Sequence, residues 1–110
     1  MVARPPRRGE VYLVNLDPTV GRKIRKTRPC VIVSPDELNE HLRTVLVAPI
    51  TTGSHDYPFR LPVRFQRKAG HLVLDQLRAV DMARLVRRLG VLPPASTTAA
   101  LAILRDCFAD

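Results

Sequence analysis

The stretch of the sequence most suited to chemistry is residues 21–30, GRKIRKTRPC, where five cationic side chains fall within seven positions. Those cations are Arg22, Lys23, Arg25, Lys26 and Arg28. Such a loop is either a solvated turn or a surface that attracts phosphate groups. Arg28 differs from the other four, because Pro29 and the apolar run CVIVS follow it and a strand there would hold its guanidinium in place. We therefore expect Arg28 to be a fixed cation and the others to form a phosphate-binding rim.

The composition limits the class of protein. The 110 residues, 45% of them hydrophobic, suit a single domain over residues 1–110 with one small core. The net charge of +8 comes from 18 Lys and Arg against 10 Asp and Glu, and it favours a polyanionic partner. Nucleic acid, an anionic membrane surface and an acidic protein all meet that requirement.

Several other classes are disfavoured. No apolar run approaches the ~18 residues of a membrane-spanning helix, and the first residues, MVARPPRRGE, lack the apolar region of a secretory signal. Cys30 and Cys107 lie in apolar stretches, which indicates core thiols of a reduced, cytoplasmic protein more than a disulfide. The spacing of Cys and His indicates no metal site, and we expect no cofactor.

The apolar pattern predicts a mainly β fold. Strands are expected at residues 10–16, 30–34, 44–50, 59–65 and 71–80, the last as one strand or two short ones. Turns are expected at residues 17–21 and 67–70, and a polar loop at residues 51–58. Residues 1–8 contain Pro5 and Pro6 and are expected to form a flexible basic arm.

Three helical segments are expected between and after these strands. Residues 35–42 suit a short helix with Ser34 as its N-cap, and residues 81–89 suit another with Asp81 as its cap. The clearest helix has Ser96 as its N-cap. Its apolar stripe, which we interpret as core, is Ala100, Ile103, Leu104, Cys107 and Phe108. The whole pattern predicts a small barrel or strongly bent sheet with this helix packed on it.

Five segments then point to a known family. They are RGEVYLVNLDPTVG, KTRPCVIVSPDELN, VAPITT, DYPFRLPV and LDQLRAVD, and they span roughly residues 8–108. Their order and short gaps closely resemble the MazF/PemK toxins, the ribonuclease components of bacterial toxin–antitoxin pairs. The resemblance implies an SH3-like β-barrel with a C-terminal helix, a homodimer, and an antitoxin whose acidic tail blocks the site. It also implies metal-independent cleavage of single-stranded RNA to 2′,3′-cyclic phosphate and 5′-hydroxyl ends.

The resemblance implies roles for particular residues. Arg28 and Thr51 match the two positions most closely tied to chemistry in the family, and Asp75 matches an acid that takes part in the PemK branch. We expect Arg28 to grip phosphate oxygens, Thr51 to donate its hydroxyl, and Asp75 to be a candidate base. His55 is a second candidate acid or base by its residue type. The candidate RNA-binding residues are Arg22, Lys23, Arg25, Lys26, Thr52, Gln76 and Arg78, with Tyr57 and Phe59 as candidate stacking rings, although Phe59 is equally suited to the core.

One departure from the family and two alternatives remain open. Many relatives read Gly-Ser-Glu after the DPT turn, whereas this chain reads Gly21, Arg22 and Lys23, which leaves the cleaved sequence and the full activity undetermined. One alternative is a gyrase poison on the same fold, like the CcdB toxins. The absence of Trp and the presence of Arg28 and Thr51 weigh against it. The other is an RNA-binding barrel without catalysis.

Overall fold

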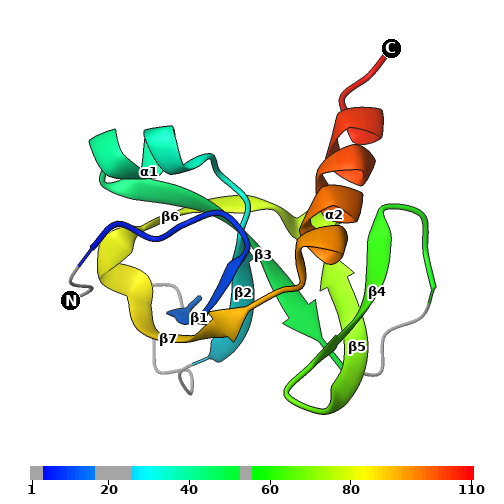
Figure 1. Cartoon of the computed structure of the whole chain (residues 1–110), viewed down its shortest axis with the longest axis horizontal. Helices are drawn as coiled ribbons and strands as arrows, with labels where there is room; N and C mark the ends of the chain where they lie inside the picture. The colour runs from blue at the N-terminus through cyan, green and yellow to red at the C-terminus, as the bar shows by residue number, and fades with distance from the viewer. Residues whose placement is uncertain (1–3, 17–25, 53–55) are drawn as a thin grey trace.

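The computed structural model describes residues 4–16, 26–52 and 56–110, and they form one bent antiparallel sheet with a C-terminal helix. The strands are β1 (Glu10–Asn15), β2 (Thr27–Ile32), β3 (Thr44–Thr51), β4 (Arg60–Phe65), β5 (Lys68–Val73), β6 (Arg78–Asp81) and β7 (Leu85–Val91). Their order is β4-β5-β3-β2-β1-β7, and β6 pairs with β3 outside that path. Figure 1 shows the sheet wrapping round on itself without closing. The mainly β, barrel-like fold predicted from the sequence is confirmed.

Strand β3 joins the two halves of the sheet. Its first part pairs with β2 and β6, and its last two residues, Ile50 and Thr51, pair with β5. Residues Cys30–Ile32 of β2 and Val47–Ile50 of β3 are buried, because one apolar cluster lies on each side of the sheet. One cluster includes Val31, Ala48 and Leu72 and receives the helix, and the other includes Cys30 and Val47.

The predicted helix at residues 81–89 is wrong. Asp81 does accept a hydrogen bond from the backbone N–H of Ala83 at 2.8 Å, but the 3-10 turn that it caps, η2, covers only Met82–Arg84. Residues Leu85–Val91 are strand β7, which pairs with β1. Tertiary pairing therefore outweighs the helix propensity of the leucines and arginines there. The segment at 71–80 is two strands separated by a 3-10 turn, η1 (Leu74–Gln76).

Both α-helices begin elsewhere than at the predicted caps. Helix α1 is Asp36–His41 with Pro35 as its N-cap, and the buried Ser34 instead donates its hydroxyl to Asn39 Oδ1 at 2.5 Å. Helix α2 is Pro94–Cys107 and begins two residues before Ser96. No helix in the described ranges is long and apolar enough to cross a membrane.

The apolar stripe of α2 is only partly in the core. Ala100 is buried, and Ile103 and Leu104 are half-buried against the cluster that includes Leu72. Cys107 is exposed and Phe108 is 75% exposed, so the prediction that these two are core residues is wrong. The helix packs against β4 and η1, and its last turn extends beyond both (Figure 1).

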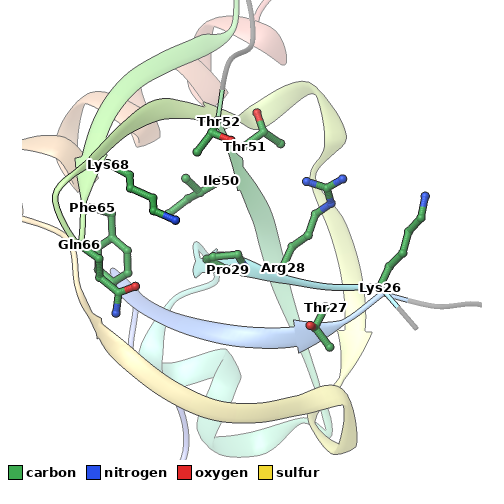
Figure 2. Close-up of a pocket in the computed structure, with 10 residues that line it drawn as sticks. All are labelled: Lys26, Thr27, Arg28, Pro29, Ile50, Thr51, Thr52, Phe65, Gln66 and Lys68. Atoms are coloured by element: carbon green, nitrogen blue, oxygen red, sulfur yellow. The ribbon is translucent and has the colours of Figure 1, made fainter. Parts of the chain in front are cut away.

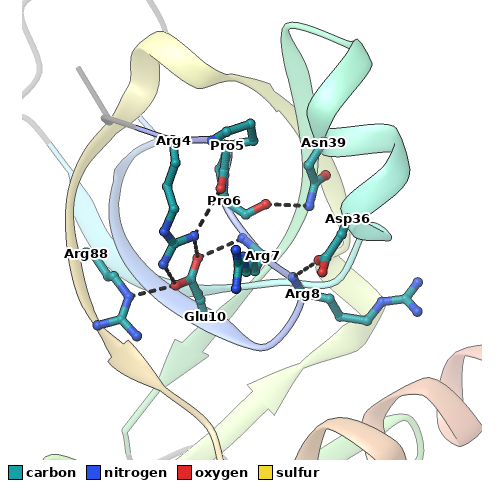
Figure 3. A network of polar contacts seen from close by, with 9 residues as sticks. All are labelled: Arg4, Pro5, Pro6, Arg7, Arg8, Glu10, Asp36, Asn39 and Arg88. Carbon is teal, nitrogen blue, oxygen red and sulfur yellow. Dashed lines mark hydrogen bonds and ion pairs between the residues drawn. The ribbon is translucent and has the colours of Figure 1, made fainter.

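The N-terminal segment from Arg4 onward is bound to the sheet, contrary to the prediction of a flexible arm. Pro6 is buried and its carbonyl accepts a hydrogen bond from Asn39 Nδ2 at 3.0 Å, while Arg8 Nε donates to the carbonyl of Val33 at 2.8 Å. Figure 3 shows how this segment runs between α1 and β7. Sequence reasoning missed the contacts of Pro6 and Arg8, because their partners Asn39 and Val33 lie 33 and 25 positions along the chain.

Glu10 is the centre of this network. Its buried carboxylate accepts hydrogen bonds from Arg4 Nη2 at 2.5 Å, from Arg88 Nε at 2.8 Å and from the backbone N–H of Arg7 at 2.7 Å (Figure 3). Burial raises the pKa of the Glu10 carboxyl, but these hydrogen bonds outweigh burial and lower the pKa to about 2. One carboxylate thus holds the N-terminal segment, β1 and β7 together.

We predict that Glu10→Gln lowers the free energy of unfolding by about 1–3 kcal/mol at neutral pH, because it removes the charge that faces two guanidinium groups. The pKa is lowered from about 4.5 to about 2, so this stabilisation is present above that upper value and is lost as the pH falls through the lower one. The difference between variant and wild type should therefore shrink over this window. Urea unfolding at stepped pH measures it.

The control for this prediction is Glu40→Gln, which changes an exposed glutamate of α1. It should shift the free energy of unfolding by less than about 0.5 kcal/mol. A destabilisation by Glu10→Gln that stayed constant down to the lowest pH would contradict the assignment.

Candidate functional site

An open groove of about 510 Å³ lies where β2, the end of β3 and the β4–β5 hairpin meet. Figure 2 shows the residues that line it, which are Lys26, Thr27, Arg28, Pro29, Ile50, Thr51, Thr52, Phe65, Gln66 and Lys68. Arg28 extends from β2 toward the end of β3, where Thr51 and Thr52 lie. The structure therefore brings the two predicted catalytic residues, Arg28 and Thr51, into one groove together with Lys26 and Thr52.

The register of β2 against β3 explains why Arg28 and Thr51 meet. The pairs Cys30↔Pro49 and Ile32↔Val47 belong to one antiparallel register, and its continuation brings Arg28 level with Thr51. Pro29 and Pro49 carry no backbone N–H, so the hydrogen-bond ladder loses donors where the groove begins. The two strand ends separate there, and their side chains face the groove.

The opposite wall is the tight turn of the β4–β5 hairpin. Phe65 pairs with Lys68, and the two residues between them, Gln66 and Arg67, have φ angles of 51° and 67°. Two consecutive positive φ values are typical of the two-residue turns that join twisted strands. The turn directs Lys68 into the groove, opposite Arg28 (Figure 2). Sequence reasoning missed Lys68, because it assigned residues 67–70 to a turn.

Gly70 lets the hairpin approach β3 closely. A Cβ atom at this position would lie 2.2 Å from the backbone oxygen of Thr51 and 3.1 Å from its carbonyl carbon. Neither atom is the end of a flexible side chain, so any larger residue would displace one of the strands. The absence of a side chain at Gly70 thus sets the position of Thr51.

The groove is positively charged. Lys26, Arg28 and Lys68 line it, and none of the ten lining residues is acidic. Burial raises the pKa of the nearby Cys30 thiol to about 12, although the charges of Arg78 and Arg28 act in the opposite direction. Cys30 is therefore protonated at neutral pH and does not act as a thiolate nucleophile or base.

The Thr51 hydroxyl is the least satisfied group at the site. Its Oγ1 atom is buried and has no hydrogen-bond partner in the described part of the chain. A buried hydroxyl without a partner costs about 1–3 kcal/mol. Thr51 therefore has an unused hydrogen-bonding group that a neighbouring side chain can satisfy, and a ligand reaches it only after a local side-chain movement.

Three other predicted site residues, Asp75, Gln76 and Arg78, do not line the groove. Asp75 lies on η1, where Arg60 Nε and Nη2 donate to its two carboxylate oxygens at 3.0 and 3.2 Å. The hydrogen bond from Arg60 lowers the pKa of Asp75, which makes it a weaker base. Gln76 is exposed on η1, and Arg78 is exposed at the start of β6 opposite Val47.

The remaining predictions concern two candidate stacking rings, Tyr57 and Phe59, and four residues whose placement is not described. Tyr57 is exposed and its ring lies 4.8 Å from the Arg60 guanidinium. Phe59 is 41% exposed, so of its two predicted roles the core is excluded and stacking stays a prediction. Arg22, Lys23, Arg25 and His55 lie outside the described residues.

Comparison with known proteins identifies the family of this chain. Residues 7–108 match the family described as PemK-like, MazF-like toxin of type II toxin-antitoxin system. The chain belongs to the PemK/MazF toxin family. It is 38% identical to endoribonuclease PemK of Escherichia coli over 78% of this chain and 69% of that protein. It is 36% identical to endoribonuclease MazF of Staphylococcus epidermidis over 76% of this chain and 74% of that protein.

Solved structures of PemK/MazF toxins share the fold. MazF from Deinococcus radiodurans superposes with a TM-score of 0.78 at 22% identity, covering 94% of this chain and 96% of that one. A mycobacterial endoribonuclease in complex with its cognate antitoxin superposes with a TM-score of 0.76 at 24% identity, covering 92% of each chain. The bent sheet and the C-terminal helix are thus the fold of these toxins.

We predict that Gly70→Ala destabilises the protein by about 1–3 kcal/mol, because the added methyl group must separate β5 from β3. The change should also shift the backbone amide resonances of Thr51 and Thr52 and reduce RNA cleavage. Ala69→Ser, at an exposed neighbouring position of the same strand, is the control and should have little effect on any of these. Wild-type stability in the Gly70→Ala variant would show that the close approach is not required.

Proposed function

We propose that this chain is a toxin that cleaves single-stranded RNA without a metal ion. The observation that carries the proposal is the shared groove of Arg28 and Thr51, with cations on both walls. The endoribonuclease names of its relatives at 36–38% identity support it. The substrate is messenger RNA, with tRNA or rRNA as further targets, and cleavage stops translation and growth.

In the proposed reaction, the 2′-oxygen of a ribose attacks the adjacent phosphorus atom. A bond from the 2′-oxygen to phosphorus forms and the bond from phosphorus to the 5′-oxygen breaks, which leaves a 2′,3′-cyclic phosphate and a 5′-hydroxyl. Negative charge increases on the non-bridging oxygens in the transition state. The planar fork of Arg28 holds two of these oxygens, and the Thr51 hydroxyl donates to one of them. One such preorganised donor contributes about 3–4 kcal/mol.

The reaction also needs a proton donor for the leaving 5′-oxygen and a base for the 2′-hydroxyl. Arg28 is a poor proton acceptor, because a guanidinium group is a donor only, so we assign it charge stabilisation and proton donation to the leaving 5′-oxygen. Asp75 remains the predicted base. Its ion pair with Arg60 and its lowered pKa both count against that role.

RNA binding in the proposal depends on charge more than on stacking. Lys26 and Lys68 flank Arg28 and would neutralise phosphates on either side of the scissile one. Thr52 is proposed to contact the base beside the cleaved bond, and Gln76 and Arg78 to contact bases farther along the strand. Arg22, Lys23 and Arg25 are proposed to extend the cationic rim. Aromatic residues make up only 5% of the chain, so stacking contributes less.

We further propose a cognate antitoxin, a homodimer and a cytoplasmic location. A partner with an acidic tail is complementary to the net charge of +8 and to a groove lined by three cations. The mycobacterial relative that shares this fold was solved in complex with its cognate antitoxin, which supports a partner of this kind.

A gyrase poison and an RNA-binding barrel without catalysis are the alternatives from other classes. The match to the PemK/MazF family over residues 7–108 counts against the first. Inhibition of gyrase without RNA damage would favour the first alternative, and RNA binding without cleavage would favour the second.

We predict that Arg28→Ala lowers the cleavage rate by about 10²–10³-fold, because it removes the donors that face the transition-state charge. Arg28→Lys keeps the charge but loses the fork, so its rate should fall between those of Arg28→Ala and wild type. The measurement is cleavage of total RNA in excess EDTA, with the 5′-hydroxyl ends mapped. Arg87→Ala removes an exposed arginine of β7 outside the groove and is the matched control. Equal losses in Arg28→Ala and Arg87→Ala would argue for a general charge effect.

We predict that Lys68→Ala weakens RNA binding and reduces its dependence on salt. Loss of one phosphate contact on a single strand should lower the slope of log Kd against log salt concentration by about 0.7. Binding of a 2′-deoxy oligonucleotide, which cannot be cleaved, measures this slope from low to high salt. Arg87→Ala should leave the slope unchanged, and an unchanged slope in Lys68→Ala would exclude a phosphate contact there.

A further inference from the structure

A histidine lies directly beside Thr51 on the adjoining strand. Strands β3 and β5 are antiparallel, and Thr51 is opposite His71 in their register. Opposed residues of antiparallel strands project to the same face of the sheet, with Cβ atoms about 4.5–5.5 Å apart. The imidazole of His71 is therefore the cross-strand neighbour of the Thr51 hydroxyl, although His71 does not line the groove.

Both of these neighbours carry a buried polar atom with no partner. Within the described ranges, Thr51 Oγ1 and His71 Nδ1 are the two buried side-chain atoms that make no hydrogen bond. The other cross-strand neighbour of His71 is Pro62, whose ring offers neither a donor nor an acceptor. A hydroxyl and an imidazole nitrogen are complementary groups, so each is the natural partner of the other.

Asp56 fixes the second nitrogen of the ring. Its Oδ1 lies 2.6 Å from His71 Nε2, and the His71 side chain is mostly buried while that of Asp56 is 88% exposed. An ionised carboxylate can only accept a hydrogen bond, so Nε2 is the donor in this contact. With Nε2 held in this way, Nδ1 is the nitrogen available to Thr51.

We propose that His71, anchored by Asp56, is a positioning residue that donates a hydrogen bond from Nδ1 to Thr51 Oγ1 when RNA is bound. Thr51 then accepts from the imidazole, and its own proton is directed to a phosphate oxygen. Both ring nitrogens donate in this arrangement, and the Asp56 carboxylate balances the charge of the ring. The inference rests on the proposed ribonuclease function and deepens it, since the Thr51 hydroxyl becomes a stronger and better-oriented donor.

Three variants distinguish the two ring nitrogens. His71→Ala removes both, His71→Asn keeps an amide near the place of Nδ1, and His71→Gln keeps one near the place of Nε2. Under single-turnover conditions in excess EDTA, His71→Ala should lower the cleavage rate about tenfold or more. The Kd for a 2′-deoxy oligonucleotide should change less than about twofold. His71→Asn should restore most of the rate, and His71→Gln should not.

Two controls separate positioning from general damage to the fold. His41→Ala removes an exposed imidazole from α1 and should cleave at the wild-type rate. Asp56→Asn weakens the anchor at an exposed position where folding is not at risk, and it should lower the rate in the same direction as His71→Ala. Melting temperatures of all variants identify any that are simply unfolded.

A double-mutant cycle gives the decisive result. In a Thr51→Val background, His71→Ala should have no further effect on the rate, because the hydroxyl it positions is already absent. Additive losses in the cycle, or rescue by His71→Gln but not by His71→Asn, would overturn the proposal. If wild type shows no Arg28-dependent cleavage, the proposed function itself fails. If wild type cleaves and His71→Ala cleaves equally fast, only the role of His71 fails.

Discussion

The antiparallel register between β2 and β3 is the constraint on which the site depends. It brings Arg28 level with Thr51, although 23 positions separate them in the sequence. The guanidinium and the hydroxyl are attached to strands whose inner residues, Cys30–Ile32 and Val47–Ile50, are buried, so holding their backbone in place costs little additional conformational entropy when a ligand binds. A slip of one residue would send one of the two side chains to the opposite face. The buried apolar residues of both strands exclude such a slip, and so the hydrophobic core determines the geometry of a polar site.

Strand β3 also positions the second wall of the groove, which is the β4–β5 hairpin. Its last residues leave the partnership with β2 and pair with β5, where Gly70 permits the backbones to approach. The hairpin then folds over the groove and brings Lys68 opposite Arg28 (Figure 2). On the far side of β5, the ion pair of Arg60 with Asp75 ties β4 to η1. Lys26 directly precedes β2, Arg28 lies near its start and Lys68 lies on β5, and both strands pair directly with β3, which fixes the cations relative to one another.

The sequence pattern correctly predicted the strands whose own apolar residues are buried in the core. The apolar runs at β1, β2 and β3 are strands with buried faces, and the strand ends carrying Arg28 and Thr51 lie together as expected. The predictions were wrong where the conformation of a segment depends on contacts with residues far along the chain. Residues 85–91 form a strand because β1 offers an edge. The segment at 4–8 is held in place because the carbonyl of Val33 accepts a hydrogen bond from Arg8 Nε and Asn39 Nδ2 donates one to the carbonyl of Pro6. Lys68 and His71 escaped notice because their meaning depends on the hairpin register, which no local pattern in the sequence specifies.

The distribution of carboxylates explains why the groove is positive. Several acids in the described ranges already serve the fold: Glu10 binds Arg4 and Arg88, Asp36 accepts from the backbone of Arg8, Asp81 caps η2, and Asp75 binds Arg60. None of these acids is among the residues that line the groove with Lys26, Arg28 and Lys68. The groove therefore holds three cations and no acid among its lining residues. A polyanion that enters the groove meets cations on both walls beside Thr51, so an arrangement in which acids pair elsewhere in the sheet favours RNA binding at the proposed catalytic residues.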